Sequence, residues 1–349
     1  PWPCKILWPH PPGAGRLWVW PTFPPGSRCV YSPPMPGAID ECDFPPEGCS
    51  GIGQSFAIRR CEVMIWPLLV REGADLTLQD VEEDNWMVVG LFAPSDTAVS
   101  GLHNNRHYDD LTLPLPDRTL RLLNAEIDTW NFYPTGAARL SVRDSLIGEV
   151  IAEDQALVTL ENVTIDGSGG YFGINREAVV EATGCTFTCD IQATGSSRAV
   201  FRDCQVLPYP QDPTGEWTQI GAFDTASIHL DRTAVATTPQ FGGQGSMAVT
   251  WLADPPAEPP RKGSPVTLHG TAAVYTLDPA VALAYWSLEA VKVKNGKAAE
   301  LGNGSANVED GALGVWEKAK RKRDYDLTLS LTDGLGRTFE SVTRVPRKP

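Results

Sequence analysis

The sequence predicts an all-β protein in which a column of stacked coils is followed by an antiparallel β-sandwich. Three observations support this fold class: a repeat of about 20 residues fills the middle of the chain, apolar and polar residues alternate within each repeat, and longer alternating segments follow near the C-terminus. The 32 glycines and 30 prolines among 349 residues favour strands and turns over helices.

The composition divides the chain into four segments. Residues 1–50 contain thirteen prolines, which exclude a helix, so we expect an extended arm or cap there. Residues 51–250 hold the repeat, residues 251–260 form a proline-rich linker, and residues 261–349 carry the sandwich. We expect the tryptophans of the arm to cover apolar surface on this chain or on a neighbouring copy. They are Trp2, Trp8, Trp18 and Trp20.

The repeat is clearest where residues 156–165 align with residues 178–187 without a gap, and residues 138–147 share the pattern. Such a unit forms one coil of short strands, and stacking the coils about 4.8 Å apart pairs each backbone group with its neighbours. Inward positions then form columns of similar residues. One column is predicted to contain Cys61, Val81, Ala125, Ser145, Val163, Cys185 and Cys204, and the turn residues Asn124, Asp144, Asn162, Gly184 and Asp203 precede it.

With this repeat, residues 51–250 resemble the right-handed parallel β-helix of the pectate-lyase-like superfamily. The strand and turn over residues 325–336 resemble those of bacterial PKD-like or Ig-like modules, with Trp286 as the expected core tryptophan. The fold class is therefore a right-handed parallel β-helix followed by an Ig-like or PKD-like antiparallel β-sandwich. The first resemblance implies a groove for acidic polysaccharides; the second implies a spacer or docking unit.

The eight cysteines include four in the first fifty residues: Cys4, Cys29, Cys42 and Cys49. We interpret these four as a disulfide-pinned segment of a secreted or cell-surface protein, with four reduced thiols as the alternative. Cys185 and Cys204 occupy equivalent positions of successive coils, which predicts either a disulfide or a ladder of buried thiols. The chain begins at Pro1, which we interpret as a processed form.

The net charge of −14 argues against nucleic acid as a partner, and no apolar run is long enough for a membrane-spanning helix. The charge is unevenly distributed: residues 1–254 carry −17 and residues 255–349 carry +3. Opposite signs on one chain favour head-to-tail self-association. The basic cluster is Lys318, Lys320, Arg321, Lys322 and Arg323, for which a solvated surface is the alternative.

One cluster has residue types suited to a metal ion, namely His103, His107 and Asp109. A hydrogen-bonded loop is the alternative reading of that cluster. No cofactor is indicated apart from calcium, for which the acidic residues 80–84 offer carboxylate oxygens. This segment lacks the EF-hand pattern, and a solvated acidic turn is the alternative.

A polysaccharide lyase would need a lysine or arginine base, and the chain has no lysine between Cys49 and Pro260. Arginines that could serve instead are Arg121, Arg139, Arg143, Arg176, Arg198 and Arg202. A hydrolase would need two carboxylates facing one groove. The candidates by residue type are Glu126, Asp128, Glu149, Glu153 and Asp154. A glycan-binding surface would use aromatic platforms, which are otherwise expected in the core. These are Trp130, Phe132, Tyr133, Tyr171 and Phe172.

We therefore expect a secreted, non-catalytic structural or adhesive surface protein, built as the self-assembling subunit of an extracellular filament. Its partners would be further copies of itself and cell-surface glycans. The alternative is a lyase or hydrolase that acts on acidic glycans in the groove of the β-helix.

Overall fold

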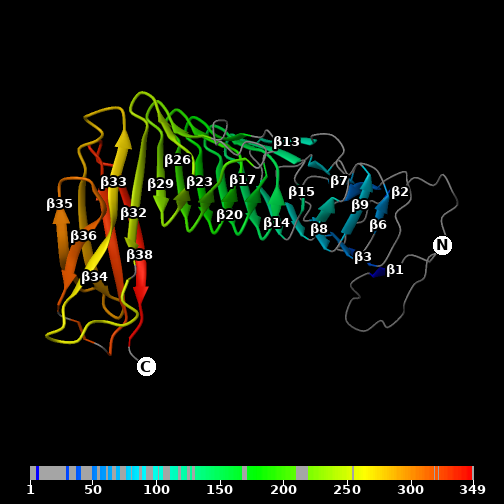
Figure 1. The fold of residues 1–349 in the computed structure, drawn as a ribbon. Coiled ribbons are helices and arrows are strands. Elements are labelled where there is room, and N and C mark those ends of the chain that lie inside the picture. The colour runs from blue at the N-terminus through cyan, green and yellow to red at the C-terminus, as the bar shows by residue number, and fades with distance from the viewer. Residues whose placement is uncertain are drawn as a thin grey trace.

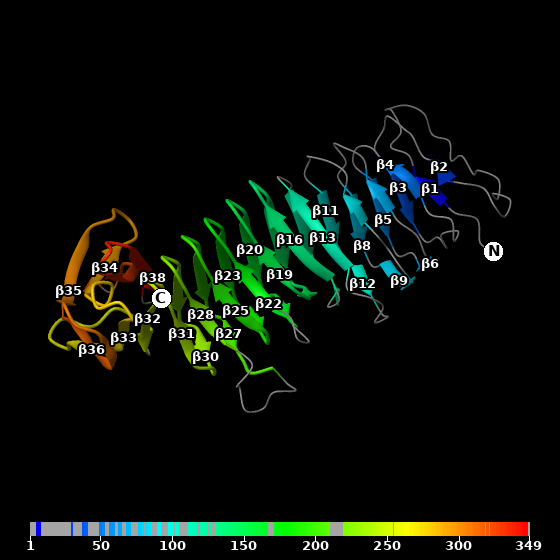
Figure 2. The ribbon, with the colours of Figure 1, turned by 90° about the horizontal axis from the view of Figure 1, so that it is seen from above.

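The computed structural model shows an elongated all-β molecule (Figure 1). Side chains are described for residues 119–123, 131–166, 171–209, 219–253, 255–317, 319–320 and 322–347, and backbone alone for further strands between residues 5 and 130. Within this part of the chain no helix is long and apolar enough to cross a membrane. Stacked coils form a shaft, and an antiparallel module closes its C-terminal end (Figures 1 and 2).

Three sheets of mostly parallel strands form the shaft. The ten-stranded sheet contains β11 (Thr97–Ser100), β14 (Thr119–Leu123), β17 (Arg139–Arg143), β20 (Leu157–Glu161), β23 (Val179–Thr183), β26 (Arg198–Arg202), β29 (Ser227–Asp231), β32 (Ser246–Ala253), β33 (Val266–Thr276) and β36 (Val308–Trp316). The nine-stranded sheet contains β6 (Glu62–Met64), β9 (Val81–Asn85), β12 (Leu102–Asn104), β15 (Glu126–Ile127), β18 (Leu146–Ile147), β21 (Thr164–Ile165), β24 (Thr186–Phe187), β27 (Gln205–Val206) and β30 (Ala234–Val235). The seven-stranded sheet contains β13 (Leu111–Pro116), β16 (Trp130–Thr135), β19 (Val150–Ala152), β22 (Tyr171–Ile174), β25 (Asp190–Ala193), β28 (Ile220–Ala222) and β31 (Pro239–Phe241).

Each coil contributes one strand to each sheet, so the predicted stacked-coil fold is confirmed over about six turns from β14 to β31. The register is regular: Leu140 pairs with Val158, and Val158 pairs with Val180. These residues point inward and are buried, whereas the residues between them are half-buried or exposed. The period-two alternation of the sequence therefore separates the core of the shaft from its surface.

Stacking also extends into the N-terminal segment. Two four-stranded sheets contain β1 (Lys5–Leu7), β2 (Cys29–Val30), β3 (Gly37–Asp40), β4 (Cys49–Ile52), β5 (Phe56–Arg59), β7 (Leu68–Val70), β8 (Leu76–Gln79) and β10 (Val89–Leu91). All their pairs are parallel except β1 with β3. Strand pairing therefore begins before residue 51, where the sequence predicted only an extended arm. No proline lies within β1 to β4, which leaves these short strands free to pair.

The turns from the ten-stranded to the nine-stranded sheet require a left-handed backbone conformation. Their residues have positive φ angles: 48° at Asp144, 54° at Asn162, 66° at Gly184 and 52° at Asp203. Asp, Asn and Gly tolerate this conformation better than most residues, which explains the turn column in the sequence. The Asn162 side chain also donates a 2.9 Å hydrogen bond to the Asp144 carboxylate one coil away.

The predicted column after these turns is a ladder of buried thiols and hydroxyls. The backbone N–H of Val163 donates to Cys185 Sγ at 3.5 Å, and the N–H of Cys185 donates to Cys204 Sγ at 3.4 Å. Cys204 in turn donates its N–H to the Thr233 hydroxyl. Cys185 and Cys204 stack as expected, and both are free thiols rather than a disulfide. The hydrogen bond with Cys185 and burial raise the pKa of Cys204, which keeps that sulfur protonated.

The first four cysteines lie where side chains are not described. Strands β2 and β4 pair so that Cys29 and Cys49 are register partners. Cys4 and Cys42 lie outside the described residues. The N-terminal disulfides therefore stay a prediction.

The C-terminal module consists of two packed antiparallel layers. One layer continues the ten-stranded sheet through β32, β33 and β36, and the other contains β35 (Ala298–Gly304), β34 (Tyr285–Lys292), β37 (Tyr325–Thr332) and β38 (Thr338–Val345). Trp286 and Trp316 are buried between the layers, so the expected core tryptophan is confirmed. β32 runs through residue 250 to Ala253, where the sequence predicted a linker, and pairs with both β29 and β33.

The module also closes the apolar end of the shaft. Tyr275 of β33 packs on the core of the coils together with Val235 and Phe241, and its hydroxyl donates a 2.8 Å hydrogen bond to Glu309. Burial and this hydrogen bond raise the pKa of Tyr275 to about 12. A coil stack with an uncovered end would expose its core, and Tyr275 supplies part of the cover.

Aromatic stacking inside the shaft gives the first prediction. Phe187 contacts Phe172 and Phe201 edge-to-face, with ring centroids 5.4 and 5.1 Å away. Phe187→Ala would leave a cavity between coils and is expected to lower the free energy of unfolding by about 3–5 kcal/mol in urea titrations. The outward neighbour Thr186 is the control, since Thr186→Ala should cost less than about 0.5 kcal/mol. Similar losses in both variants would contradict the inward column.

Candidate functional site

The outer face of the ten-stranded sheet changes character where the C-terminal module covers it. Outward residues of β17, β20 and β23 are half-buried or exposed, whereas Ser227, His229 and Asp231 of β29 are at most 3% exposed. β38 lies over β29 and β32, which explains this burial. Polar residues that the module covers therefore lie next to polar residues that are open to solvent. We treat this junction as a candidate functional site.

Charged side chains join the module to the shaft. The Asp231 carboxylate accepts a 2.6 Å hydrogen bond from the Ser341 hydroxyl of β38 and lies 2.9 Å from the Arg232 guanidinium. Arg232 also binds both carboxylate oxygens of Asp203, at 2.7 and 3.0 Å, and donates to Ser341. Two strands distant in sequence are thereby held in one relative position. A buried network of this kind is weak evidence for added stability, because the desolvation of the charges offsets their attraction.

His229 is buried within the same junction. Its Nε2 atom lies 2.7 Å from the Thr250 hydroxyl, and its ring packs 5.4 Å from that of Phe339. Burial, together with the charges of Arg202 and Arg232, lowers the pKa of His229 to about 3. The imidazole is therefore neutral at physiological pH.

A second group of bonds holds the hairpin between β37 and β38 against the shaft. Arg337 forms an ion pair with the buried Asp333 at 2.6 Å and donates to the Ser246 hydroxyl and the Thr225 carbonyl, at 2.7 and 2.8 Å. Asp333 also accepts the backbone N–H groups of Leu335 and Arg337. The tip of this hairpin therefore has a fixed position over the coils.

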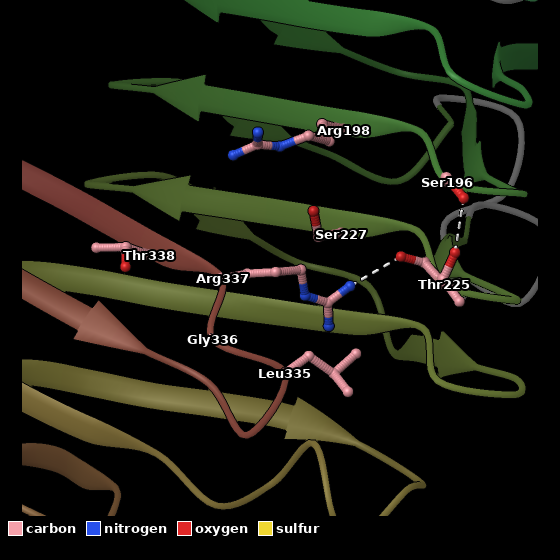
Figure 3. A pocket seen from close by; sticks show the side chains of 8 residues that line it. All are labelled: Ser196, Arg198, Thr225, Ser227, Leu335, Gly336, Arg337 and Thr338. Carbon is pink, nitrogen blue, oxygen red and sulfur yellow. Dashed lines mark hydrogen bonds between the residues drawn. The ribbon is translucent and has the colours of Figure 1, made fainter.

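An open hollow of about 590 Å³ lies between this hairpin and the shaft (Figure 3). One wall consists of Arg198 and Ser227 on the sheet and of Ser196 and Thr225 in the turns before it, and the other consists of residues 335–338. Ser196 and Thr225 bind each other through their hydroxyls at 2.9 Å. The lining contains two arginines and no carboxylate, although the shaft segment as a whole is acidic.

Polar and aromatic residues also gather on the outside of the seven-stranded sheet. Tyr171 lies 3.5 Å from the Gln192 side chain, and burial with the nearby charges of Asp190 and Glu149 raises the pKa of Tyr171. Asp190 accepts a 2.8 Å hydrogen bond from the Gln219 N–H, and burial raises its pKa. Glu149 was a predicted carboxylate, whereas Asp190 was not, because its sequence context resembles an ordinary strand start.

The other predicted carboxylates and platforms are not brought together. Asp154 forms an ion pair with Arg176 in a turn. Glu126 lies in β15, where only the backbone is described, as does Trp130 in β16, and Asp128 lies outside the described residues. Glu153 is half-buried in the turn beside Asp154.

Phe132 and Phe172 are fully buried, which confirms the expectation that they belong to the core and rules them out as glycan platforms. They occupy inward positions of their strands, whereas the neighbouring residues Tyr133 and Tyr171 are half-buried on the outer face.

The predicted metal cluster is described only in part. β12 places His103 in register with Glu82 of β9 and Glu126 of β15, while His107 and Asp109 lie outside the described residues. Among the residues with described side chains, no group of three His, Cys, Asp or Glu residues could hold a metal ion. The acidic segment 80–84 lies in a part of the chain without described side chains, so a calcium site there stays a prediction.

Of the predicted assembly residues, Lys320, Lys322 and Arg323 are exposed in the C-terminal module. Lys318 and Arg321 lie outside the described residues, as do Trp2, Trp8, Trp18 and Trp20. No family model, no curated protein and no solved structure matches the chain.

The buried histidine gives a prediction about pH. An unfolded histidine has a pKa near 6.5, so the unfolded chain binds a proton at His229 below that pH, whereas the folded chain binds it only near pH 3. The stability from this group is present above pH 6.5 and is lost as the pH falls toward 3. When the pH falls from 6.5 to 4.5, the free energy of unfolding should therefore decrease by about 2–3 kcal/mol more in the parent than in His229→Gln.

Urea titrations at pH 7, 6, 5 and 4 measure this difference. The exposed His269 of β33 is the control, and His269→Gln should follow the parent curve. Parallel curves for the parent and His229→Gln would show that His229 is accessible to protons in the folded chain.

Proposed function

We propose that this chain is a non-catalytic structural or adhesive component of a secreted or cell-surface assembly. The observation that carries this proposal is the shared strand β32, which pairs with β29 of the shaft and with β33 of the module. Because the Asp231–Ser341 and Arg337–Ser246 bonds also span the junction, shaft and module form one rigid unit. Rigidity along a repeating axis suits a spacer that holds a terminal module at a distance.

The resemblance of the coils to the pectate-lyase-like superfamily, and of the module to PKD-like or Ig-like domains, supports an extracellular setting. Modules of the second kind are commonly spacers or docking units. The shaft would then present the module, and the module would hold a neighbour or a surface.

Charge favours self-association of these rigid units. The first 254 residues carry −17, and the remainder carries +3, with Lys320, Lys322 and Arg323 exposed in the module. Since the module has a fixed position on the shaft, a contact between its basic segment and the acidic shaft of the next copy would repeat with one geometry. Repeated heterologous contacts that do not close produce filaments.

Sedimentation velocity tests the assembly. The full chain should form large particles at low salt, and these should shrink as salt screens the contact. Lys320→Glu, Lys322→Glu and Arg323→Glu together should leave monomers, as should a second variant in which Trp2, Trp8, Trp18 and Trp20 are replaced by serine. A matched control reverses three exposed basic residues of the shaft, Arg121, Arg139 and Arg143, and should still assemble. Large particles in both test variants would refute self-assembly through these segments.

The surface around Tyr171 and Asp190 favours one alternative, a hydrolase that acts on acidic glycans. A half-buried carboxyl whose pKa is raised by desolvation is suited to donate a proton to a leaving group. Incubation with polygalacturonate and alginate, with and without calcium, separates the two functions: products that disappear in Asp190→Asn would favour catalysis, and intact polymers would favour the structural role.

A further inference from the structure

The hollow beside the C-terminal module includes Thr338, the first residue of β38, and Arg198, the first residue of β26. We use the word groove for the strip between the free edge of β38 and the outer face of β26, which starts at this hollow. β38 is the last strand of its sheet, and among the described residues no strand pairs with its other edge. In an antiparallel pair every second residue directs its N–H and C=O away from the partner strand. The free edge of β38 therefore offers a row of backbone donors and acceptors above the shaft.

The floor of this groove is the outer face of β26. The register of β26 and β29 places Arg198, Val200 and Arg202 beside Ser227, His229 and Asp231. Ser341 of β38 binds Asp231 and Phe339 packs on His229, so β38 lies along β29. A strand added to the free edge of β38 would consequently lie over β26, which is the first strand left uncovered.

Along the floor, two arginines lie on either side of an apolar residue. Arg198 is exposed, and no hydrogen bond or ion pair of its guanidinium occurs among the described residues. Val200 is half-buried, and Arg202 lies 4.0 Å from the carboxylate of Asp231. Arg337 on the opposite wall is already neutralised by Asp333, so Arg198 is the uncompensated charge of the hollow.

The spacing of the floor matches the side-chain period of a β-strand. Residues 198, 200 and 202 follow one another at about 6.8 Å, which is also the separation of residues i, i+2 and i+4 on one face of an added strand. A strand with an acidic, an apolar and an acidic residue at those positions would place a carboxylate on each arginine and a side chain on Val200. Arginine binds carboxylates through two parallel hydrogen bonds.

We propose that this groove binds an extended acidic peptide segment as an additional strand on β38, with Arg198 as its principal carboxylate anchor. Backbone hydrogen bonds to the strand edge would provide affinity, and the alternating floor would provide specificity. Peptide binding at this place would be one way for the protein to act as the adhesive component proposed above. Only this biological role of the binding rests on the proposed function.

The test uses fluorescence anisotropy with the full chain and a labelled heptapeptide, in which glutamate, valine and glutamate alternate with threonines. Arg198→Gln should weaken binding at least tenfold, since it removes a charge-assisted contact. Arg139→Gln is the matched control: it removes the same charge from the first position of β17, three strands away, and should bind like the parent. Thermal unfolding of both variants checks that they are folded.

Three further probes identify the ligand chemistry. A heptapeptide that is N-methylated at alternate residues keeps its charges but cannot donate to the edge of β38, and it should bind at least tenfold more weakly. Comparing a free with an amidated C-terminus distinguishes a terminal carboxylate from the glutamate side chains as the group held by Arg198. Trigalacturonate supplies carboxylates on a sugar chain.

Equal binding by the parent and Arg198→Gln, or equal losses in Arg198→Gln and Arg139→Gln, would overturn the inference. Undiminished binding of the N-methylated peptide would exclude strand addition. Binding of trigalacturonate without binding of the peptide would assign the groove to a glycan and overturn the inference as well. None of these results changes the sedimentation of the unliganded chain, so failure here is distinguishable from failure of the proposed assembly.

Discussion

Parallel backbone hydrogen bonds between successive coils are the interaction on which the other features depend. A single coil of about 20 residues cannot bury its apolar side, and its N–H and C=O groups along the shaft axis are satisfied only by the coils before and after it. The inward columns maintain this pairing, because a shift of one residue would turn Val158 and Val180 toward solvent. Regular register is thus a consequence of burial on one face.

The same ladder connects the shaft to the C-terminal module. β32 pairs in parallel with β29 and antiparallel with β33, so the sheet changes direction without an interruption of its hydrogen bonds. The second layer of the module then covers β29 and removes water from its polar side chains, so these side chains need hydrogen-bond partners from the module. The hydrogen bonds of Asp231 with Ser341 and of Arg337 with Ser246 hold the edge of that layer on the shaft. The outer face of β26 stays uncovered because β38, the end strand of that layer, contacts β29 and β32.

The sequence was sufficient for the repeat but not for the junction. Inward alternation and the turn residues from Asp144 to Asp203 are local patterns that recur from coil to coil, so they could be predicted. The stacking of Cys185 on Cys204 followed from the same alignment of successive coils. Ser227, His229 and Asp231 follow the same alternation as exposed residues, and nothing nearby shows that a strand more than 100 residues later covers them. The boundary at residue 250 was missed for a related reason. The prolines after residue 254 indicate a linker, but the strand before them continues to Ala253.

Hydrogen–deuterium exchange of the full chain tests most directly whether shaft and module are one cooperative body. If β32 belongs to both, amides of β23, β32 and β33 should share one level of protection and lose it together as urea is added. Loss of protection in β33 and β37 at lower urea, while β23 and β29 stay protected, would show that the module unfolds alone and would contradict the account.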